Sequence, residues 1–252
     1  MTGTLYLVPN ALDFGVSEAG LGDLQQVLPL GVIRIAARLP CWVAENAKTT
    51  RAFLKRVNDI VPLTQPLQSI AIVELPRPPK GGAAAPEPNL KALLAPAVAG
   101  QDIGLISEAG LPAIADPGAD LVRLAHAKGI KVRPLVGPSS ILLALMASGL
   151  NGQNFAFVGY LPQDAGERSA RLKQLESLAH KTGQTQLWIE TPYRNAAMLS
   201  GLLQSLQGGT RLAIASGLTL PSARIQSHTV AQWKKGLQGP DGHTPAVYAI
   251  GP

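Results

Sequence analysis

Short runs of β-branched and other apolar residues alternate with segments of helical periodicity along most of this 252-residue chain. The strand-like runs are residues 5–9, 69–75, 103–107, 130–136, 155–159, 184–190, 211–216 and 246–250. The segments of helical periodicity are residues 46–61, 89–99, 117–128, 139–148, 167–180, 192–206 and 230–237. Alternation of this kind favours layered α/β folds over sandwiches and helical bundles. We therefore expect an α/β protein.

Composition narrows the class of protein further. The chain has 26 Gly and 21 Pro, about 19% of its residues, which is below the roughly 25–30% typical of disordered low-complexity chains. It has no apolar run of the roughly 18 residues that a membrane-spanning helix needs and no secretory leader at its start. The single cysteine, Cys41, excludes a disulfide framework, and the four histidines lack metal-ligand spacing. We expect a cytoplasmic protein with no membrane segment and no metal.

Net charge leaves the partner open. The charge is +6 and the isoelectric point is about 9.6, which is compatible with a polyanion such as RNA. It is equally compatible with an ordinary, mildly basic cytoplasmic protein. No run of five like charges decides between the two.

Residues 76–88, PRPPKGGAAAPEP, differ from the rest of the first half. Five prolines and two glycines in thirteen residues exclude a continuous helix or strand. Long irregular segments in compact domains are often functional lids, although some are plain linkers. We expect either a flap that faces the substrate or an inert linker.

Residues 106–118, ISEAGLPAIADPG, are the sharpest motif. They follow a buried strand and lead into a helix, and open α/β sheets bind ligands at the carboxyl ends of their strands. Two glycines and two prolines between Gly110 and Gly118 shape a fixed loop, in which Asp116 and Glu108 would neutralise a positive ligand group. The alternative is a tight strand–helix connection in which Asp116 caps the next helix.

A second shaped turn follows at residues 137–140, GPSS. Ser139 and Ser140 are suited to cap a helix or to bond a ligand. Two such loops at two strand ends are able to enclose a small molecule between two domains.

Several absences weigh against whole classes of enzyme. The first strand runs into Pro9 without a glycine fingerprint for a dinucleotide, and the chain has no P-loop and no nucleophile elbow. Hydride transfer, kinase and triad-hydrolase chemistry are therefore disfavoured.

Residues 190–194, ETPYR, end one strand and begin a helix. Glu190 and Arg194 are placed either to pair with each other or to reach into an interdomain cleft.

The order of these motifs resembles the tetrapyrrole methylase superfamily, the class III S-adenosylmethionine-dependent methyltransferases. The resemblance is strongest to the ribosomal RNA small-subunit methyltransferase I family, whose signature is roughly S-D-A-G-x-P-x-I-S-D-P-G, then G-P-S, then G-F-L-P. The first part is similar to residues 107–118, the second to residues 137–139 and the third to GYLP at residues 159–162. Residues 190–194 are similar to the family's E-S-P-x-R segment.

The resemblance implies two α/β domains, residues 1–137 and 138–252, with S-adenosylmethionine in the cleft between them, and it implies a homodimer. By the same likeness, the cofactor-binding residues are Pro9, Ser107, Ala109, Gly110, Pro112, Ile114, Ala115, Asp116, Pro138, Ser139, Ser140, Gly159, Tyr160, Pro245 and Ala246.

Departures from the family pattern lie on the substrate side. The family's E-D-T-R-x-T segment is Glu45-Asn46-Ala47-Lys48-Thr49-Thr50 here, Glu108 stands where Asp is usual, and residues 76–88 replace a polar loop. The methyl donor is therefore indicated more firmly than the acceptor.

The function expected from the resemblance is methyl transfer from S-adenosylmethionine to ribosomal RNA, at the ribose 2′-oxygen of a small-subunit nucleotide. Two alternatives remain open: a tetrapyrrole or other small-molecule acceptor, and a non-catalytic S-adenosylmethionine-binding protein. A ribose hydroxyl must lose its proton, and the candidate catalytic residues are Glu45, Asp116 and Glu190. The candidate phosphate-binding residues are Lys48, Arg51, Arg77, Lys80 and Arg194, with Arg34 and Arg38 beside them.

Overall fold

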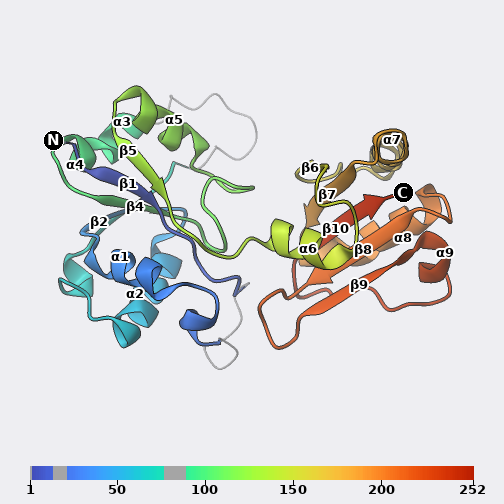
Figure 1. Ribbon diagram of the computed structural model, residues 1–252, viewed down its shortest axis with the longest axis horizontal. Helices are drawn as coiled ribbons and strands as arrows, with labels where there is room; N and C mark the ends of the chain where they lie inside the picture. The colour runs from blue at the N-terminus through green and yellow to red at the C-terminus, as the bar shows by residue number, and fades with distance from the viewer. Residues whose placement is uncertain (1, 14–21, 77–88) are drawn as a thin grey trace. The chain divides into compact units, whose positions relative to one another are not determined.

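The computed structural model describes residues 2–13, 22–76 and 89–252 (Figure 1). Within these residues, contacts divide the chain into two compact units. The first consists of Met1–Ala11 and Gly22–Pro138 as far as they are described, and the second mainly of Ser139–Pro252. Each unit has its own sheet. The division after Pro138 lies one residue from the predicted domain boundary.

The first unit is built on a five-stranded sheet of order β3-β2-β4-β1-β5, in which all four pairings are parallel. Parallel pairing brings the carboxyl ends of all five strands to one edge, which is where open α/β sheets bind ligands. The strands are β1 (Thr4–Leu7), β2 (Cys41–Ala44), β3 (Ala71–Glu74), β4 (Ile103–Ile106) and β5 (Lys131–Pro134).

Helices cover both faces of this sheet, as Figure 1 shows, because the three central strands β1, β2 and β4 are apolar on both sides. Tyr6, Trp42 and Ile106 point to one face and share a core with α1 and α2. Their strand neighbours Leu5 and Leu105 point to the other face and pack with α4 and α5. The helices are η2 (Leu24–Gln26), α1 (Leu30–Arg38), α2 (Ala47–Ile60), η3 (Leu67–Ser69), α3 (Leu90–Leu93), α4 (Ala95–Val98) and α5 (Ala119–Ala127).

The second unit has a five-stranded sheet of order β6-β7-β10-β8-β9, in which only β6 and β7 are parallel. The last strand of the chain, β10, is the central strand of this sheet. The strands are β6 (Phe155–Phe157), β7 (Thr185–Glu190), β8 (Arg211–Ser216), β9 (Arg224–Thr229) and β10 (Ala246–Gly251).

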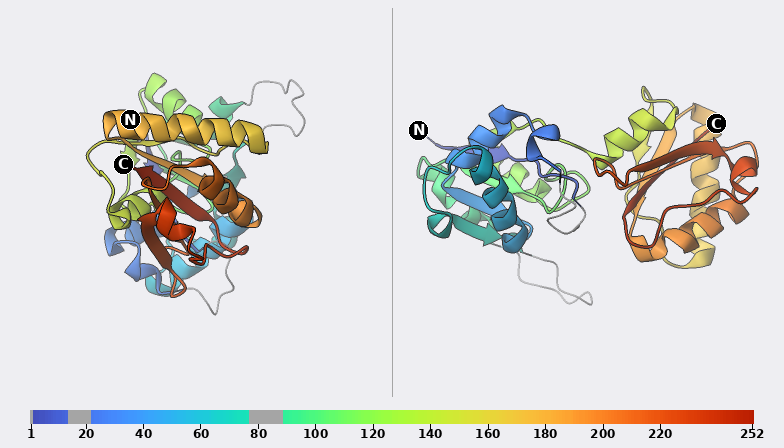
Figure 2. Two further views of the ribbon diagram at one scale, coloured as in Figure 1. Left: turned by 90° about the vertical axis from the view of Figure 1, so that its right-hand side faces the viewer. Right: turned by 90° about the horizontal axis from the view of Figure 1, so that it is seen from below.

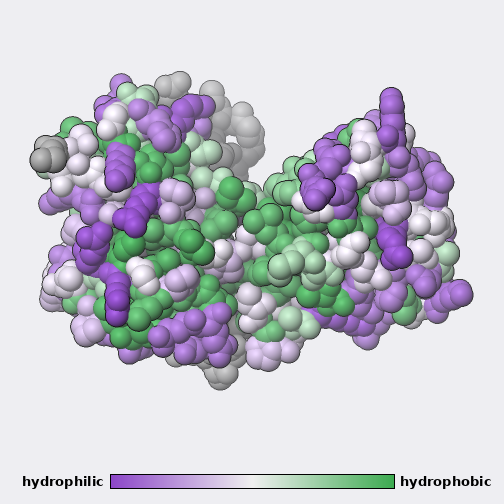
Figure 3. Space-filling model, in the orientation of Figure 1, coloured by the Kyte–Doolittle hydropathy of each residue, from purple (hydrophilic) through white to green (hydrophobic). Residues whose placement is uncertain are grey.

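One face of the second sheet carries the larger aromatic residues. Trp188 stacks on Tyr248 with ring centroids 5.8 Å apart, and both pack in a core with α7 and α8; α7 is the long ochre helix in the left view of Figure 2. The opposite face is covered by α6, on which Leu142 and Met146 are exposed. Hydrophobic residues accordingly gather over α6 in Figure 3. The helices are α6 (Ser140–Ser148), α7 (Ala165–Thr182), η4 (Pro192–Arg194), α8 (Asn195–Ser205) and α9 (Val230–Trp233).

The expected α/β class is confirmed, and so are most of the expected elements. The single helix expected at residues 89–99 is wrong: the structure has the short helices α3 and α4, separated at Leu94. Pro96, in the first turn of α4, has no N–H to continue a hydrogen-bond ladder from α3. Of the segment at residues 76–88, all but Pro76 lies outside the described residues.

In the described part of the chain, no helix is both long enough and apolar enough to cross a membrane.

Candidate active site

Four segments of the first unit meet at the carboxyl edge of its sheet. Pro9 and Asn10 follow β1, Glu45 follows β2, residues 107–118 (the 107–118 loop) follow β4, and Gly137 follows β5. The sheet order places β1 between β4 and β5, with β2 on the far side of β4. Side chains from distant parts of the sequence therefore converge beside the 107–118 loop.

Asn10 fastens this loop to the end of β1. Its Nδ2 donates to the carbonyls of Ser107 (3.3 Å) and Glu108 (2.9 Å), and its Oδ1 accepts from the N–H of Ala11 (2.9 Å). Its backbone forms an antiparallel bridge with Gly110 at 2.9 and 3.2 Å. Asn10 is buried. No local sequence signal indicates its role, because both the bridge and the contacts of its amide nitrogen join residues about 100 positions apart.

The loop is held in a conformation that few residues adopt. Ala113 and Ala115 have φ of 64° and 61°, in the left-handed region, and Gly110 and Gly118 also have positive φ. A non-glycine residue in this region costs of order 1–3 kcal/mol and persists only where its surroundings determine it. Such residues cluster at ligand sites, so the backbone favours the ligand-binding interpretation of the motif.

The alternative role for Asp116, a cap for the next helix, is wrong. Helix α5 begins at Ala119, its N-cap residue is Gly118 with φ of 129°, and no side chain caps it. The Asp116 carboxylate is thus not committed to the helix.

Three carboxylates lie close together at this edge. Oε2 of Glu45 accepts a hydrogen bond from the N–H of Glu108 at 2.9 Å. Burial, and after it the negative charge of Glu45, raise the pKa of Asp116 to about 7; Glu108 acts in the same direction, while the Ser107 hydroxyl opposes the rise. A carboxyl group near neutral pKa beside two further carboxylates suits a cationic ligand or proton transfer.

The other predicted residues of the loop divide by exposure. Ser107, Gly110 and Pro112 are buried, whereas Ile114 and Ala115 are exposed. The buried members fix the loop, and the exposed ones are accessible to a ligand. Ala109, which lies between Ser107 and Gly110 in the sequence, is partly buried.

The turn after β5 packs tightly on the turn after β1. A Cβ built on Gly137 would lie 2.2 Å from the Cβ of Pro9, so only glycine fits there. Pro138 ends the first unit. Ser139 is the N-cap of α6 and its hydroxyl accepts from the N–H of Leu142 at 3.4 Å, which confirms the capping interpretation.

The predicted second-unit contacts lie on separate segments. Gly159 has φ of 77°, and Tyr160 next to it is 57% exposed. Pro245 precedes Ala246, the buried first residue of β10. Ser140, the remaining predicted contact, is the first residue of α6.

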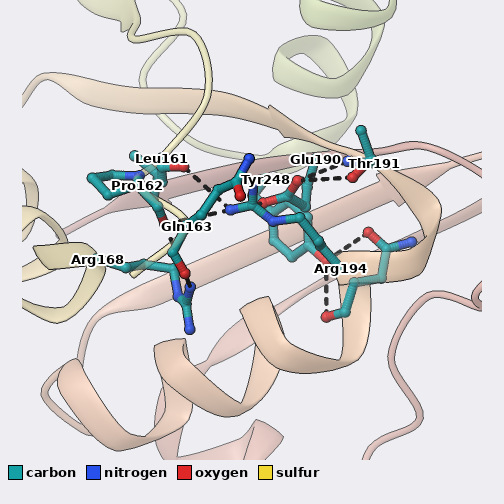
Figure 4. A network of polar contacts seen from close by, with 9 residues as sticks. Leu161, Pro162, Gln163, Arg168, Glu190, Thr191, Arg194 and Tyr248 are labelled. Atoms are coloured by element: carbon teal, nitrogen blue, oxygen red, sulfur yellow. Dashed lines mark hydrogen bonds and ion pairs between the residues drawn. The ribbon is translucent and has the colours of Figure 1, made fainter. Parts of the chain in front are cut away.

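The structure brings Glu45 and Asp116 together in the first unit, whereas Glu190 belongs to the second. The Glu190 side chain is 0% exposed and its Oε2 lies 3.1 Å from Nη2 of Arg194, whose side chain is 15% exposed. Figure 4 shows this ion pair among the carbonyls of the 161–163 turn.

Of the predicted phosphate-binding residues, Lys48 and Arg51 are exposed on α2, the helix that begins two residues after Glu45. Arg77 and Lys80 lie outside the described residues. Among the residues that the structure describes, no group of three or more His, Cys, Asp or Glu side chains is arranged to hold a metal ion.

Comparison with known proteins places this chain in a family. A sequence model described as Tetrapyrrole (Corrin/Porphyrin) Methylases matches residues 19–233. The protein named Ribosomal RNA small subunit methyltransferase I of Streptococcus pyogenes serotype M3 is 31% identical over 231 residues, 92% of this chain and 70% of that protein. The protein of the same name from Mesorhizobium japonicum is 38% identical over 138 residues, 55% of this chain.

The chain spans about half the length of the first relatives that it matches, 46% in the M. japonicum protein. Among solved structures, uroporphyrin-III C-methyl transferase from Thermus thermophilus complexed with S-adenyl homocysteine shares the fold. Its TM-score is 0.52 at 18% identity, covering 99% of this chain and 97% of that one.

The resemblance drawn from the motifs is thereby confirmed. The chain belongs to the tetrapyrrole methylase family, and the two relatives described above are named ribosomal RNA small subunit methyltransferase I.

Proposed function

We propose that this protein is an S-adenosylmethionine-dependent methyltransferase that methylates small-subunit ribosomal RNA at a ribose 2′-oxygen. The observation that carries the proposal is the 107–118 loop, a strained, anchored loop that contains Asp116 and lies beside Glu45, in a member of the methylase family. The names of its relatives support RNA as the acceptor.

The acidic residues at the carboxyl edge of the first sheet fit S-adenosylmethionine. The cofactor carries positive charge, and Glu45, Glu108 and Asp116 supply negative charge at the edge of the sheet. The exposed residues Ile114 and Ala115 offer backbone and apolar contacts. When bound, the cofactor supplies an activated methyl group, so the reaction depends chiefly on alignment of the acceptor.

We assign Asp116 as the general base that takes the proton from the acceptor's hydroxyl group. A ribose hydroxyl needs a general base, and a base is most effective when its pKa lies near the working pH. Burial and the charge of Glu45 raise the pKa of Asp116 to about 7. Glu45 thus acts on the reaction by tuning Asp116.

Helix α2 is the surface that we assign to the RNA backbone. Lys48, Arg51 and Lys55 are exposed at spacings of three and four residues, which puts them on one side of the helix. The N-terminal end of α2 directly follows Glu45. A phosphate chain bound along this side would therefore lead to the carboxylates.

The decisive experiment offers labelled S-adenosylmethionine and three acceptors: small-subunit particles, protein-free small-subunit RNA and a panel of tetrapyrroles. We expect label in small-subunit ribosomal RNA and none in the tetrapyrroles. Label in a tetrapyrrole would redirect the proposal to a small-molecule acceptor, and cofactor binding without transfer to any acceptor would indicate a non-catalytic binding protein.

Two variants refine this test. Asp116→Asn should abolish the rise of kcat between about pH 6 and 8 while leaving RNA binding intact. Lys48→Ala/Arg51→Ala should weaken RNA binding and flatten the slope of log K against log salt by about 0.7–0.9 for each lost phosphate contact. An unchanged salt slope would remove α2 from the RNA-binding surface.

We also propose that the protein works in the cytoplasm, where ribosomes are assembled, and as a homodimer, as the motif resemblance implies. Sedimentation equilibrium at micromolar concentration tests the assembly. A mass of one chain, 26.3 kDa, would contradict it.

A further inference from the structure

We infer that Arg194 and Asn195 are positioning residues that hold the two second-unit segments predicted to contact the methyl donor. These segments are the turn at residues 159–163 and residues 241–246. The inference rests on the proposed function for what the segments bind, but the contacts themselves are properties of the second unit.

Arg194 acts on the turn. Its Nη2 donates to the carbonyls of Leu161 (3.2 Å) and Pro162 (3.4 Å) and lies 3.1 Å from Oε2 of Glu190, as the dashed lines in Figure 4 show. These carbonyls directly follow Gly159 and Tyr160 in the sequence. The guanidinium thus sets the course of the chain next to both predicted cofactor contacts.

Glu190 holds Arg194 in place. Its side chain is fully buried, and Oε1 accepts from the N–H of Thr191 at 2.8 Å, which leaves Oε2 directed at Arg194. A buried carboxylate requires a compensating charge, and Arg194 supplies it. Both groups are therefore committed to each other, which disfavours the predicted roles of Glu190 as a base and of Arg194 as a phosphate ligand.

The rest of the turn is fixed in the same way. The Gly159 carbonyl accepts from the N–H of Ile189 at 3.1 Å, and the Gln163 carbonyl accepts from Nη1 of Arg168 at 2.8 Å. Donors on β7, η4 and α7 thus hold the backbone on both sides of Tyr160. The Tyr160 side chain itself remains mostly exposed.

Asn195, the next residue after Arg194, acts on the second segment. Its Nδ2 donates to the carbonyls of Asp241 (2.8 Å) and Thr244 (2.9 Å). Its Oδ1 accepts from the hydroxyl of Tyr248 at 3.1 Å, and burial raises the pKa of that hydroxyl, so it remains a donor. Pro245 and Ala246 follow directly after the anchored carbonyls.

One short stretch, residues 190–195, therefore controls two loops that are distant in sequence. A merely structural network would contribute to stability only. A positioning network also sets the geometry of the loops. The two roles are distinguished by a variant that lacks the hydrogen-bond donors of Arg194 but keeps the stability of the wild type.

The experiment measures three properties of each variant: melting temperature, affinity for S-adenosylhomocysteine by calorimetry well below the melting temperature, and hydrogen exchange by peptide. The variants are Arg194→Met, the double variant Glu190→Gln/Arg194→Met, and Asn195→Ala. Arg123→Met is the matched control, because Arg123 also pairs with a nearby acid, Asp120 at 3.0 Å, but on an exposed surface.

We expect Arg194→Met to lower the melting temperature and to weaken the binding of S-adenosylhomocysteine at least tenfold. The double variant removes the uncompensated buried charge, so its melting temperature should recover while its affinity stays at least tenfold weakened. In both, exchange should rise in peptides covering residues 157–164. Asn195→Ala should raise exchange at residues 239–246, and the Arg123 control should match the wild type in all three.

Wild-type affinity in the double variant would overturn the inference. So would exchange that rises in the two Arg194 variants elsewhere than in the 157–164 peptides, or in Asn195→Ala elsewhere than in the 239–246 peptides. If the wild-type protein itself bound no S-adenosylhomocysteine, the proposed function would fail. The exchange measurements would then still decide whether residues 190–195 hold the two loops.

Discussion

Replacing Asn10 by alanine should loosen the 107–118 loop, because the side-chain amide of Asn10 fastens the loop to the end of β1. The substitution removes its hydrogen bonds to the carbonyls of Ser107 and Glu108 and to the N–H of Ala11. The backbone bridge to Gly110 remains. The loop would stay attached but lose its buried side-chain anchor.

The magnitude follows from these contacts. A typical hydrogen bond contributes about 0.5–1.5 kcal/mol, and a buried group left without a partner costs about 1–3 kcal/mol. Asn10 is buried and makes three side-chain hydrogen bonds, so we expect a loss of about 2–4 kcal/mol. At about 2–4 °C per kcal/mol for a chain of this size, the melting temperature should fall by roughly 4–16 °C.

The assay is thermal and urea unfolding of the wild type, Asn10→Ala, Asn10→Asp and a matched control, Asn58→Ala. Asn58 also bonds a backbone N–H, that of Leu63 at 3.1 Å, but on the exposed side of α2. Its replacement should cost less than about 1 kcal/mol. Asn10→Asp puts carboxylate oxygens against two carbonyls, so it should cost at least as much as the alanine variant at pH 8.

Equal losses for Asn10→Ala and Asn58→Ala would refute the reasoning, since they would show that the buried anchor contributes no more than an exposed turn. The alanine variant should in addition raise hydrogen exchange in peptides covering residues 107–118.

Three further predictions concern the same edge of the sheet. Burial first, and then the charge of Glu45, raise the pKa of Asp116 from 3.8 to about 7. The folded protein therefore binds the proton more tightly than the unfolded chain, and wild-type stability should fall as the pH rises from about 4 to above 7. Asp116→Asn should match the wild type near pH 4 and exceed it at pH 8 by on the order of 1–2 kcal/mol after screening, and urea midpoints that stay equal at pH 8 would argue against this. Gly137→Ala would place a Cβ 2.2 Å from that of Pro9 and should cost about 3 kcal/mol or more, whereas Gly209→Ala, which meets nothing within 4 Å, should shift the melting temperature by no more than about 2 °C. Ala115→Val puts a β-branched residue at φ of 61° and should cost more than about 1 kcal/mol; a neutral result in calorimetric unfolding would mean that the loop relaxes freely.

Periodicity and turn chemistry predicted the layers of this fold but not all of its parts. Helix α1 (Leu30–Arg38), strand β2 and strand β9 were not expected. Strand β2 has four residues, CWVA, and is buried on both faces, so it has no alternation to detect. Strand β9, RIQSHT, is mostly polar and becomes a strand only by pairing with β8.

The parts of the candidate site that depend on residues close together in the sequence are predictable from it. Glycine and proline spacing identified the 107–118 loop, and the serine after Gly137 was expected as a helix cap and is one. Asn10 was missed because its partners lie about 100 residues away. The spacing indicates that Glu190 and Arg194 can pair, but only the fold shows that Arg194 also donates to the carbonyls of Leu161 and Pro162.

The central place of β10 (Ala246–Gly251) governs the order in which the two sheets can form during synthesis. The first sheet has all its strands once residue 134 has left the ribosome, and its unit is complete four residues later. The second sheet is divided into β6–β7 and β8–β9 until β10 arrives, because each pair reaches the other only through it. Domains fold as units during synthesis at about 5–20 residues per second, so the first unit has several seconds to fold before the second sheet is able to close. Through that interval, β7 and β8 lack their β10 partner and expose strand edges, which makes the second unit prone to aggregation until β10 is synthesised.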